Sequence, residues 1–188
     1  MNRVTLLCGS RKPAPGVDRK SSSRELLQAV RAGLADHHVT AVELDLRDLD
    51  IPQFDGRTVD EYGSPDLTHV REVVDKTDVL VVSVPAYWNA ASGPLVNLCN
   101  VLGGAAYDRD PDSRPPLDGL TVVLLTVGAD AASAYHAAAQ MRLVFSALGA
   151  WVAPTEVVIG NPRETPDLRR VIRSLRELGA FAATVNRG

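Results

Sequence analysis

With 188 residues, the chain is long enough for one domain with a hydrophobic core of its own. Its hydrophobic content of 45%, charged content of 23% and net charge of −3 at pH 7 exclude a broad basic surface for nucleic acid. The first residues lack a signal-peptide pattern, and no apolar run is long enough to span a membrane. We therefore expect a single cytoplasmic domain over residues 1–188.

The cysteines and histidines give no sign of a metal centre or of a side-chain catalyst. Cys8 and Cys99 lie in apolar runs far apart in the sequence, which is typical of buried free thiols in a reducing compartment. None of the four histidines lies at a spacing from an acid or a nucleophile that would indicate a catalytic base. They are His37, His38, His69 and His136. We predict no metal ligand and no catalytic side chain.

The first stretch of the chain predicts a strand, a polar loop and a helix. Residues 4–8 are apolar or β-branched and predict a buried strand, which the chain leaves sharply at Gly9. Ser22 and Glu25 have the spacing of a capping box and predict a helix that starts there. The apolar stripe of this helix is Leu27, Val30 and Leu34.

Between this strand and helix, hydroxyl and basic residues predict a site for a phosphate group. Backbone N–H groups and the positive end of a helix dipole favour an anion at a helix N-terminus. The hydroxyl donors, which we name the phosphate cradle, are Ser10, Ser21, Ser22 and Ser23. The basic residues around them are Arg11, Lys12, Arg19, Lys20 and Arg24. Serine runs also cap helices without a ligand, and basic loops are often only solvated, so this short pattern alone leaves both interpretations open.

The middle of the chain continues to alternate strands and helices. Residues 39–46 alternate and predict a second strand, and the apolar spacing over residues 67–74 predicts a helix. Residues 79–84 are apolar without alternation, as expected of a central parallel strand that Pro85 ends. A loop over residues 86–92 then leads to a third helix, which opens at Gly93-Pro94 and is apolar on more than one face.

The second half of the chain repeats this alternation. After a long connection over residues 103–119, residues 121–127 predict the fourth strand, followed by an alanine-rich helix. Residues 151–159 predict the fifth strand, and Thr165-Pro166 begins a last helix that runs to Leu178. Five strands alternating with five helices predict an α/β protein with a three-layer, doubly wound, parallel five-stranded sheet of order 2-1-3-4-5.

In such a sheet, ligands bind beyond the carboxyl ends of strands 1 and 3, where the winding reverses. Three irregular segments are predicted to meet there: residues 10–23, 85–93 and 127–130. The phosphate cradle belongs to the first of them. The position of the phosphate cradle and the chemistry of its residues therefore both indicate a ligand site.

Four stretches carry a resemblance to a known family. They are Gly9-Ser10-Arg11 with Ser21-Ser22-Ser23, Leu44-Asp45-Leu46 running to Ile51-Pro52, Pro85-Ala86-Tyr87 to Ser92-Gly93-Pro94-Leu95 with Asn97, and Met141-Arg142 to Gly149. Over essentially its whole length, the sequence resembles the NAD(P)H-dependent FMN reductase family of flavodoxin-like proteins. The serine triplet and residues 90–93 look closest to the reductases that supply reduced FMN to alkanesulfonate monooxygenases.

The resemblance implies FMN and NAD(P)H as cofactors and a set of contact residues. The first loop would hold the FMN phosphate, through Ser10, Arg11, Ser21, Ser22 and Ser23. A second loop would lie along the isoalloxazine ring, with Gly128 on the opposite side. Its contact residues would be Pro85, Ala86, Tyr87, Trp88, Asn89 and Ser92.

The implied reaction is the reduction of FMN by NAD(P)H, by hydride transfer to flavin N5. It needs the two rings to be positioned and no side-chain acid or nucleophile. The reduced flavin would pass to a partner monooxygenase or another acceptor. The alternatives are an FMN-containing quinone, azo or chromate reductase, a non-enzymatic flavodoxin-like electron carrier, and a chain that kept the fold and lost the flavin.

Two departures from the family pattern and two apolar helices lead to further expectations. The first loop has an insertion around residues 14–18, and Gly128-Ala129-Asp130 stands where a glycine pair is common. If Asp130 faces the ring, it would repel reduced flavin, so we expect FMN to exchange. The apolar third helix and the alanine-rich fourth helix predict a homodimer or homotetramer.

Overall fold

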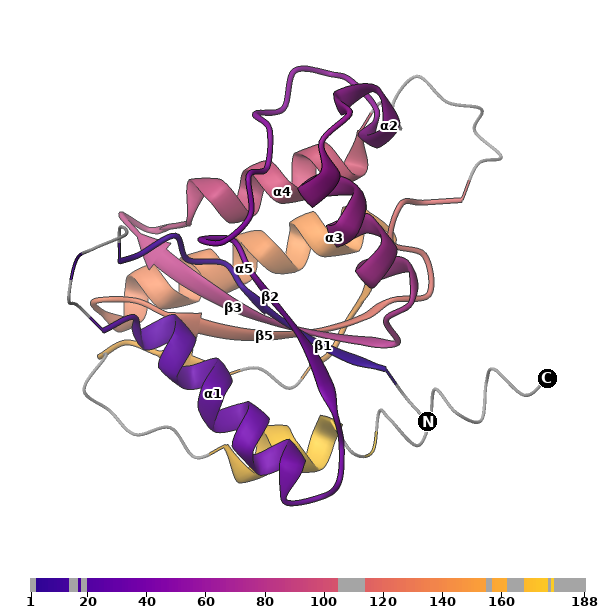
Figure 1. The fold of residues 1–188 in the computed structure, drawn as a ribbon. Coiled ribbons are helices and arrows are strands. Elements are labelled where there is room, and N and C mark those ends of the chain that lie inside the picture. The colour runs from indigo at the N-terminus through magenta and orange to yellow at the C-terminus, as the bar shows by residue number, and fades with distance from the viewer. Residues whose placement is uncertain are drawn as a thin grey trace.

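A computed structural model describes residues 3–13, 17, 20–104, 114–154, 157–161, 168–175 and 177. At its centre lies a largely parallel sheet of strand order β2-β1-β3-β5-β6 (Figure 1). The strands are β1 (Val4–Cys8), β2 (Ala41–Asp45), β3 (Val79–Tyr87), β4 (Ala90–Ala91), β5 (Thr121–Val127), β6 (Trp151–Val152) and β7 (Val157–Ile159). The short β4 pairs antiparallel with β3, and β7 pairs parallel with β5. The predicted order is confirmed along the main path of the sheet; β4 is a further short strand, and β7 lies within the predicted fifth strand.

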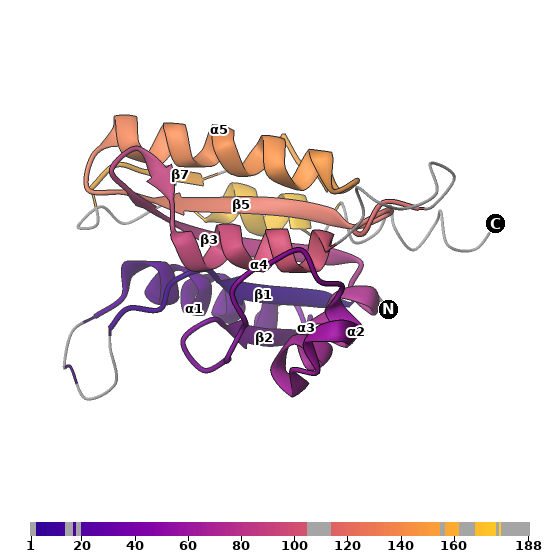
Figure 2. The same cartoon turned by 90° about the horizontal axis from the view of Figure 1, so that it is seen from above.

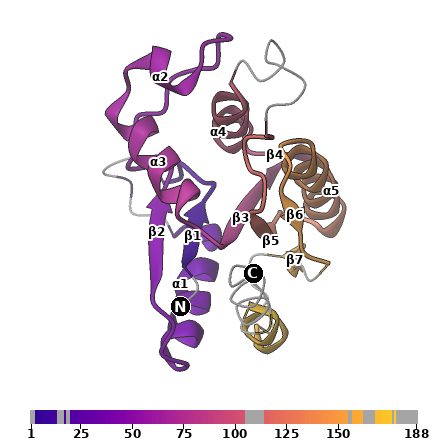
Figure 3. The same cartoon turned by 90° about the vertical axis from the view of Figure 1, so that its right-hand side faces the viewer.

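Helices cover both faces of this sheet. They are α1 (Ser22–Ala35), α2 (Val59–Tyr62), α3 (Pro65–Asp75), α4 (Gly93–Gly103) and α5 (Ala131–Ala147), and residues 169–175 are helical as well. Helices α3, α4 and α5 lie on one face, and α1 lies on the other with the helical residues 169–175 (Figures 1 and 3). The predicted three-layer α/β fold is therefore confirmed. Among the described residues, no helix is both long and apolar enough to cross a membrane.

The central strand β3 explains why the sheet is covered on both faces. All of its residues except Tyr87 are buried. Leu80, Val82 and Val84 belong to the core on the side of α3, α4 and α5, whereas Val79 and Val81 belong to the core on the side of α1. Side chains alternate along a strand, so an unbroken apolar run supplies both cores.

Pro85 does not end this strand, contrary to the sequence prediction. The ladder of β3 continues to Tyr87, and Pro85 pairs in register with Val127 of β5. On the other side β1 has already ended, because its last residue, Cys8, pairs with Ser83. The Pro85 carbonyl accepts a hydrogen bond from the Ser92 N–H at 2.9 Å. Proline lacks only a donor, and it is tolerated here because the neighbouring strand stops short of it.

The predicted fifth strand is broken in two. Trp151 and Val152 of β6 pair with the beginning of β5, and β7 pairs with its end. Pro154 lies between them, and a proline cannot donate to the ladder. The break therefore has a visible cause in the sequence.

A short helix that we did not predict, α2, lies in the polar connection after β2. Its start carries the Thr58-x-x-Glu61 capping pattern, in which the Glu61 carboxylate accepts from the Thr58 N–H at 2.7 Å. Most of the first-loop insertion (residues 14–16 and 18), most of the long connection (residues 105–113) and several residues of the last helix lie outside the described residues.

Candidate functional site

Two of the three predicted segments meet at the carboxyl edge of the sheet. The Gly9 N–H donates to the Ser83 carbonyl at 3.0 Å, and the buried Ser92 hydroxyl donates to the Gly9 carbonyl at 2.6 Å. Further along the first loop, the Lys12 ammonium lies 4.5 Å from the centre of the Tyr87 ring, a cation–π contact. The first loop and the segment after β3 therefore form one continuous site.

Gly9 makes this close approach possible. A Cβ atom at this position would lie 2.6 Å from the Ser83 carbonyl oxygen and 3.0 Å from a methyl of Leu95. Both are closer than van der Waals contact allows, and the carbonyl belongs to the rigid backbone of β3. The glycine is required by the crossing of two chain segments, in addition to the turn that the sequence indicates.

The phosphate cradle lies at the N-terminus of α1. The N-cap is Ser21, one residue earlier than predicted, so the capping box of Ser22 and Glu25 does not form. The Ser21 carbonyl accepts from the N–H groups of Arg24 and Glu25, whereas its hydroxyl makes no capping hydrogen bond. Glu25 instead pairs with Lys20 at 3.7 Å.

The donor set at this helix end suits an anion. Among the described residues, no hydrogen bond engages the N–H groups or hydroxyls of Ser22 and Ser23. Ser21 and Ser22 are half-buried, whereas Ser10 and Ser23 are buried. The Ser10 hydroxyl oxygen accepts from the Lys12 N–H at 3.1 Å, which leaves its hydrogen available to donate. Free donors at the positive end of a helix fit a phosphate group.

Of the basic residues that we predicted around the cradle, Arg24 has a structural role. Its guanidinium binds both carboxylate oxygens of Asp45, at 2.6 and 2.8 Å, and donates to the Lys12 carbonyl at 2.9 Å. The bidentate pair ties α1 to β2, and the third bond holds the first loop. Arg11 is exposed and has no partner among the described residues, so it is the cation left for a phosphate; Arg19 lies outside them.

The segment after β3 is a hairpin and not the open loop that we predicted. Residues 85–92, which we name the aromatic hairpin, pair Ala86 with Ala91 and Tyr87 with Ala90. Trp88 and Asn89 form its two-residue turn with positive φ angles of 51° and 62°. Such turns fit the twist of a hairpin but favour asparagine or glycine, and a tryptophan there is unusual.

The hairpin presents part of its predicted contact set to solvent. The Trp88 side chain is 97% exposed, Tyr87 is 37% exposed, and Asn89 is exposed. Pro85, Ala86 and Ser92 are buried. The Ser92 hydroxyl is engaged by Gly9, so these three residues support the hairpin, and its tip is the part open to a ligand.

The third segment follows β5. Gly128 is buried, its N–H donates to the Ile159 carbonyl at 2.9 Å, and a Cβ atom there would lie 3.0 Å from the Ala134 nitrogen. Asp130 is the N-cap of α5 and accepts from the Ser133 N–H at 2.8 Å. That hydrogen bond and one from the Ser133 hydroxyl hold the pKa of Asp130 below its ordinary value. The carboxylate therefore caps α5 and stays negatively charged.

Sequence reasoning missed two residues of α5 that contact the aromatic hairpin. The Gln140 side-chain oxygen accepts from the Ala91 N–H at 2.8 Å, and the Ser133 hydroxyl lies 3.0 Å from Asn89 Oδ1. Ser133 and Gln140 are seven residues apart, which places them on the same face of a helix. Two polar residues at this spacing in an alanine-rich helix were the signal available in the sequence.

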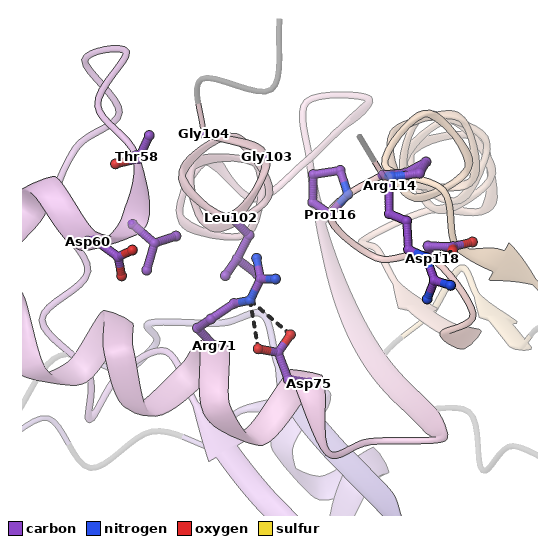
Figure 4. A pocket seen from close by; sticks show the side chains of 12 residues that line it. Thr58, Asp60, Arg71, Asp75, Leu102, Gly103, Gly104, Arg114, Pro116 and Asp118 are labelled. Carbon is purple, nitrogen blue, oxygen red and sulfur yellow. Dashed lines mark hydrogen bonds and ion pairs between the residues drawn. The ribbon is translucent and has the colours of Figure 1, made fainter. Parts of the chain in front are cut away.

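Two cavities help to delimit the site. One of about 320 Å³ lies beside the first loop and the start of α4; it is lined by Arg11, Leu46, Leu49, Ile51, Gln53, Gly93, Pro94 and Asn97. A larger one of about 510 Å³ lies at the opposite edge of the sheet, by the ends of α3 and α4 (Figure 4). Its arginines Arg71 and Arg114 pair with Asp75 and Asp118. The larger cavity is not the candidate site, because ligands of such sheets bind at the carboxyl edge, where the winding of the sheet reverses.

A doubly wound parallel sheet, with a helix N-terminus whose donors suit an anion and an aromatic hairpin at its carboxyl edge, defines a flavodoxin-like nucleotide-binding protein. The chain belongs to the NADPH-dependent FMN reductase family, whose sequence pattern matches residues 2–164. The resemblance expected from the sequence is thereby confirmed. So are the class of activity, an NAD(P)H-dependent FMN reductase, and the cofactors FMN and NAD(P)H.

Solved structures share the fold at low sequence identity. The apo form of the NADH:FMN oxidoreductase EMOB is 15% identical with a TM-score of 0.67, over 98% of this chain and 90% of that one. The flavoenzyme NAD(P)H:(acceptor) oxidoreductase FerB from Paracoccus denitrificans is 13% identical with a TM-score of 0.64, over 98% and 94%. An azoreductase from Bacillus anthracis is 20% identical with a TM-score of 0.58, over 97% and 99%. No curated protein matches the chain in sequence.

Proposed function

We propose that this protein binds FMN at the carboxyl edge of its sheet and reduces it with NAD(P)H, for release to a partner monooxygenase or another acceptor. With both cofactors bound, the nicotinamide C4 would supply a hydride, with its electron pair, to flavin N5, and solvent would supply the proton. The observation that carries the proposal is the contact of the first loop with the aromatic hairpin, through Ser92–Gly9 and Lys12–Tyr87.

The proposed roles follow from the hydrogen-bond donors and exposed side chains at the carboxyl edge of the sheet. The N–H groups and hydroxyls of residues 21–23 would bind the phosphate with Ser10 and Arg11, because in the described part of the chain these donors at the positive end of α1 have no acceptor. Tyr87, Trp88 and Asn89 would lie along the ring, and Gly128 would border its other side. Lys12, at 4.5 Å from the Tyr87 ring, brings a positive charge to the junction.

We propose further that FMN exchanges and is not held permanently. A long first loop loses more entropy on closing than a short one, which weakens the grip on a phosphate. The full exposure of Trp88 points the same way, because a ring beside it would stay open to water. Asp130 stays charged at the N-terminus of α5, and a charged carboxylate facing the ring would add to the exchange by repelling reduced flavin.

We also propose a homo-oligomer, on grounds that differ from those of the sequence. The apolar faces of α4 are covered by the rest of this chain, since α4 lies between α3 and α5 (Figure 2) and five of its residues are buried. The outward face of α5 is what stays open: Tyr135 is 60% exposed and Leu143 is 73% exposed. A second copy would cover these side chains.

Steady-state turnover tests the proposed function. The protein as purified should be largely colourless and should oxidise NADPH in air only after FMN is added. Stoichiometric FMN that survives gel filtration would contradict exchange and favour a reductase with a resident flavin. Flavin binding without NAD(P)H oxidation would favour an electron carrier, and a complete lack of flavin binding would leave only the fold.

A further inference from the structure

The aromatic hairpin depends on α5 for its position. Its two strands pair over only two residue pairs, and a ribbon of this size has little stability of its own. Its turn places Trp88 in the left-handed region of φ, which a bulky side chain rarely adopts unless the surroundings impose it. Something outside the hairpin must therefore hold it.

Two side chains of α5 make the contacts that do so. Gln140 Oε1 accepts from the Ala91 N–H at 2.8 Å, at the second strand of the hairpin. Ser133 Oγ lies 3.0 Å from Asn89 Oδ1, at the turn. Since these residues are two helical turns apart on one face of α5, they contact the turn and the second strand of the hairpin.

Ser133 also joins the hairpin to the segment after β5. Its hydroxyl has one hydrogen, which it can donate to Asn89 Oδ1 or to Asp130 Oδ2, both 3.0 Å away, and its N–H donates to Asp130 Oδ1 at 2.8 Å. The tip of the hairpin and the segment that begins at Gly128 are thus fixed to the same turn of α5. These are the two segments that flank the proposed ring site.

From these contacts we infer that Gln140 and Ser133 are positioning residues for the flavin site: they hold the aromatic hairpin in the arrangement that receives the ring. The inference rests on the proposed function. Binding is tighter when a loop is ordered beforehand, because the cost of ordering it is not subtracted from the binding free energy. Releasing the hairpin should therefore weaken FMN binding although neither side chain needs to touch FMN.

Three variants test the inference. Gln140→Leu removes the acceptor of the Ala91 N–H, whereas Gln140→Glu keeps an oxygen acceptor of similar reach. Gln28→Leu is the matched control, because Gln28 lies on α1 and its amide contacts the exposed Glu43 side chain. Two quantities are measured: amide hydrogen exchange at Ala91 without flavin, and the Kd for FMN by titration.

We expect Gln140→Leu to speed the exchange of the Ala91 amide and to weaken FMN binding by about tenfold. Gln140→Glu should restore both, and Gln28→Leu should change neither. The melting temperature separates this from general destabilisation, since a purely structural role would lower it and leave the Kd for FMN as it is. If Gln140→Leu does not fold, Ser133→Ala carries the test, because it keeps the backbone N–H that donates to the Asp130 cap of α5.

The outcomes separate this inference from the function on which it rests. Faster exchange at Ala91 with an unchanged Kd for FMN would overturn the positioning role and leave the proposed function standing. Unchanged exchange would show that the hairpin does not depend on Gln140 and would overturn the inference as well. If the unmodified protein itself does not bind FMN, both fall.

Discussion

At the scale of single residues, the half-buried Ser22 gives the sharpest test of the phosphate cradle. Ser22→Asp would place a negative charge where the phosphate is proposed to bind. FMN affinity should fall by well over tenfold, which corresponds to more than about 1.4 kcal/mol. Titration of the variant with FMN measures the change.

Loss of folding would not explain such a result. An aspartate in the first turn of a helix interacts favourably with its dipole, so α1 should be at least as stable in the variant. Ser146→Asp, at an exposed position in α5, makes the same change away from the site and serves as the control. Unaltered FMN affinity in Ser22→Asp would place the phosphate elsewhere.

The buried thiol of Cys99 predicts how stability depends on alkaline pH. Burial raises its pKa from 9.0 to about 12. In the unfolded chain the thiol ionises above about pH 9, so the unfolded state binds fewer protons there and the stability falls as pH rises. By pH 10 the loss should be about 1.4 kcal/mol, since one pKa unit is worth that much.

Urea unfolding at pH 8 and pH 10 measures this slope, and Cys99→Ala should reduce it. Burial also raises the pKa of Cys8, so part of the slope should persist in the variant. Neither thiol should react with a thiol reagent at pH 8 until the protein is unfolded. Rapid labelling of the native protein would contradict the burial of both cysteines.

Site residues could be predicted from the sequence where their role depends on residues close to them in the chain. Ser21, Ser22 and Ser23 stand out because a strand precedes them and a helix follows, and this local order already implies a helix N-terminus at a sheet edge. Gln140 could not be found in this way. Its partner, Ala91, is distant in the sequence, and the hydrogen bond exists only because α5 packs on the hairpin.

At the scale of elements, the first loop is held by Arg24. Its guanidinium connects α1 to Asp45 of β2 and to the Lys12 carbonyl of the loop. Arg24→Ala should lower the free energy of unfolding by about 1 to 2 kcal/mol, because charge-assisted hydrogen bonds are lost at a site that is partly open to water. The KM for FMN should rise severalfold, since Lys12 is released.

Arg24→Lys separates the two effects. Lysine keeps the charge but lacks the planar fork that binds a carboxylate through two hydrogen bonds. Stability should then recover in part, and the KM for FMN should stay raised. A variant with a normal KM would show that the first loop does not depend on this clamp.

Helices and strands were predicted well where a single hydrophobic pattern extends over the whole helix or strand. The apolar run of β3 and the stripes of α1 and α3 have this property. The aromatic hairpin was not predicted, because Pro85 is a local signal for the end of a strand. A proline is tolerated at this position of β3 because the neighbouring strand, β1, ends before it. The residues next to Pro85 in the sequence do not reveal where β1 ends.

At the scale of the whole molecule, the outward face of α5 predicts association of the chain. Light scattering at micromolar concentration should give the mass of a dimer or a tetramer. Leu143→Glu should shift the protein toward the monomer, because it would bury a charge in the contact. Val42→Glu, on β2 and 49% exposed, should leave the mass unchanged. A monomer in the unmodified protein would contradict the proposal.

The central proposal for the whole molecule is that FMN binds at the carboxyl edge of the sheet, beside the aromatic hairpin. The protein contains two tryptophans, and they lie at opposite edges. Trp88 is at the tip of the hairpin, whereas Trp151 begins β6 and pairs with the first residue of β5. Each can therefore report on one edge when the other is replaced by phenylalanine.

The decisive measurement is the quenching of tryptophan fluorescence on titration with FMN in Trp151→Phe and in Trp88→Phe. We predict strong, saturable quenching of Trp88 in the first variant and much weaker quenching of Trp151 in the second. Equal quenching in both, or quenching of Trp151 alone, would contradict a flavin site at the carboxyl edge.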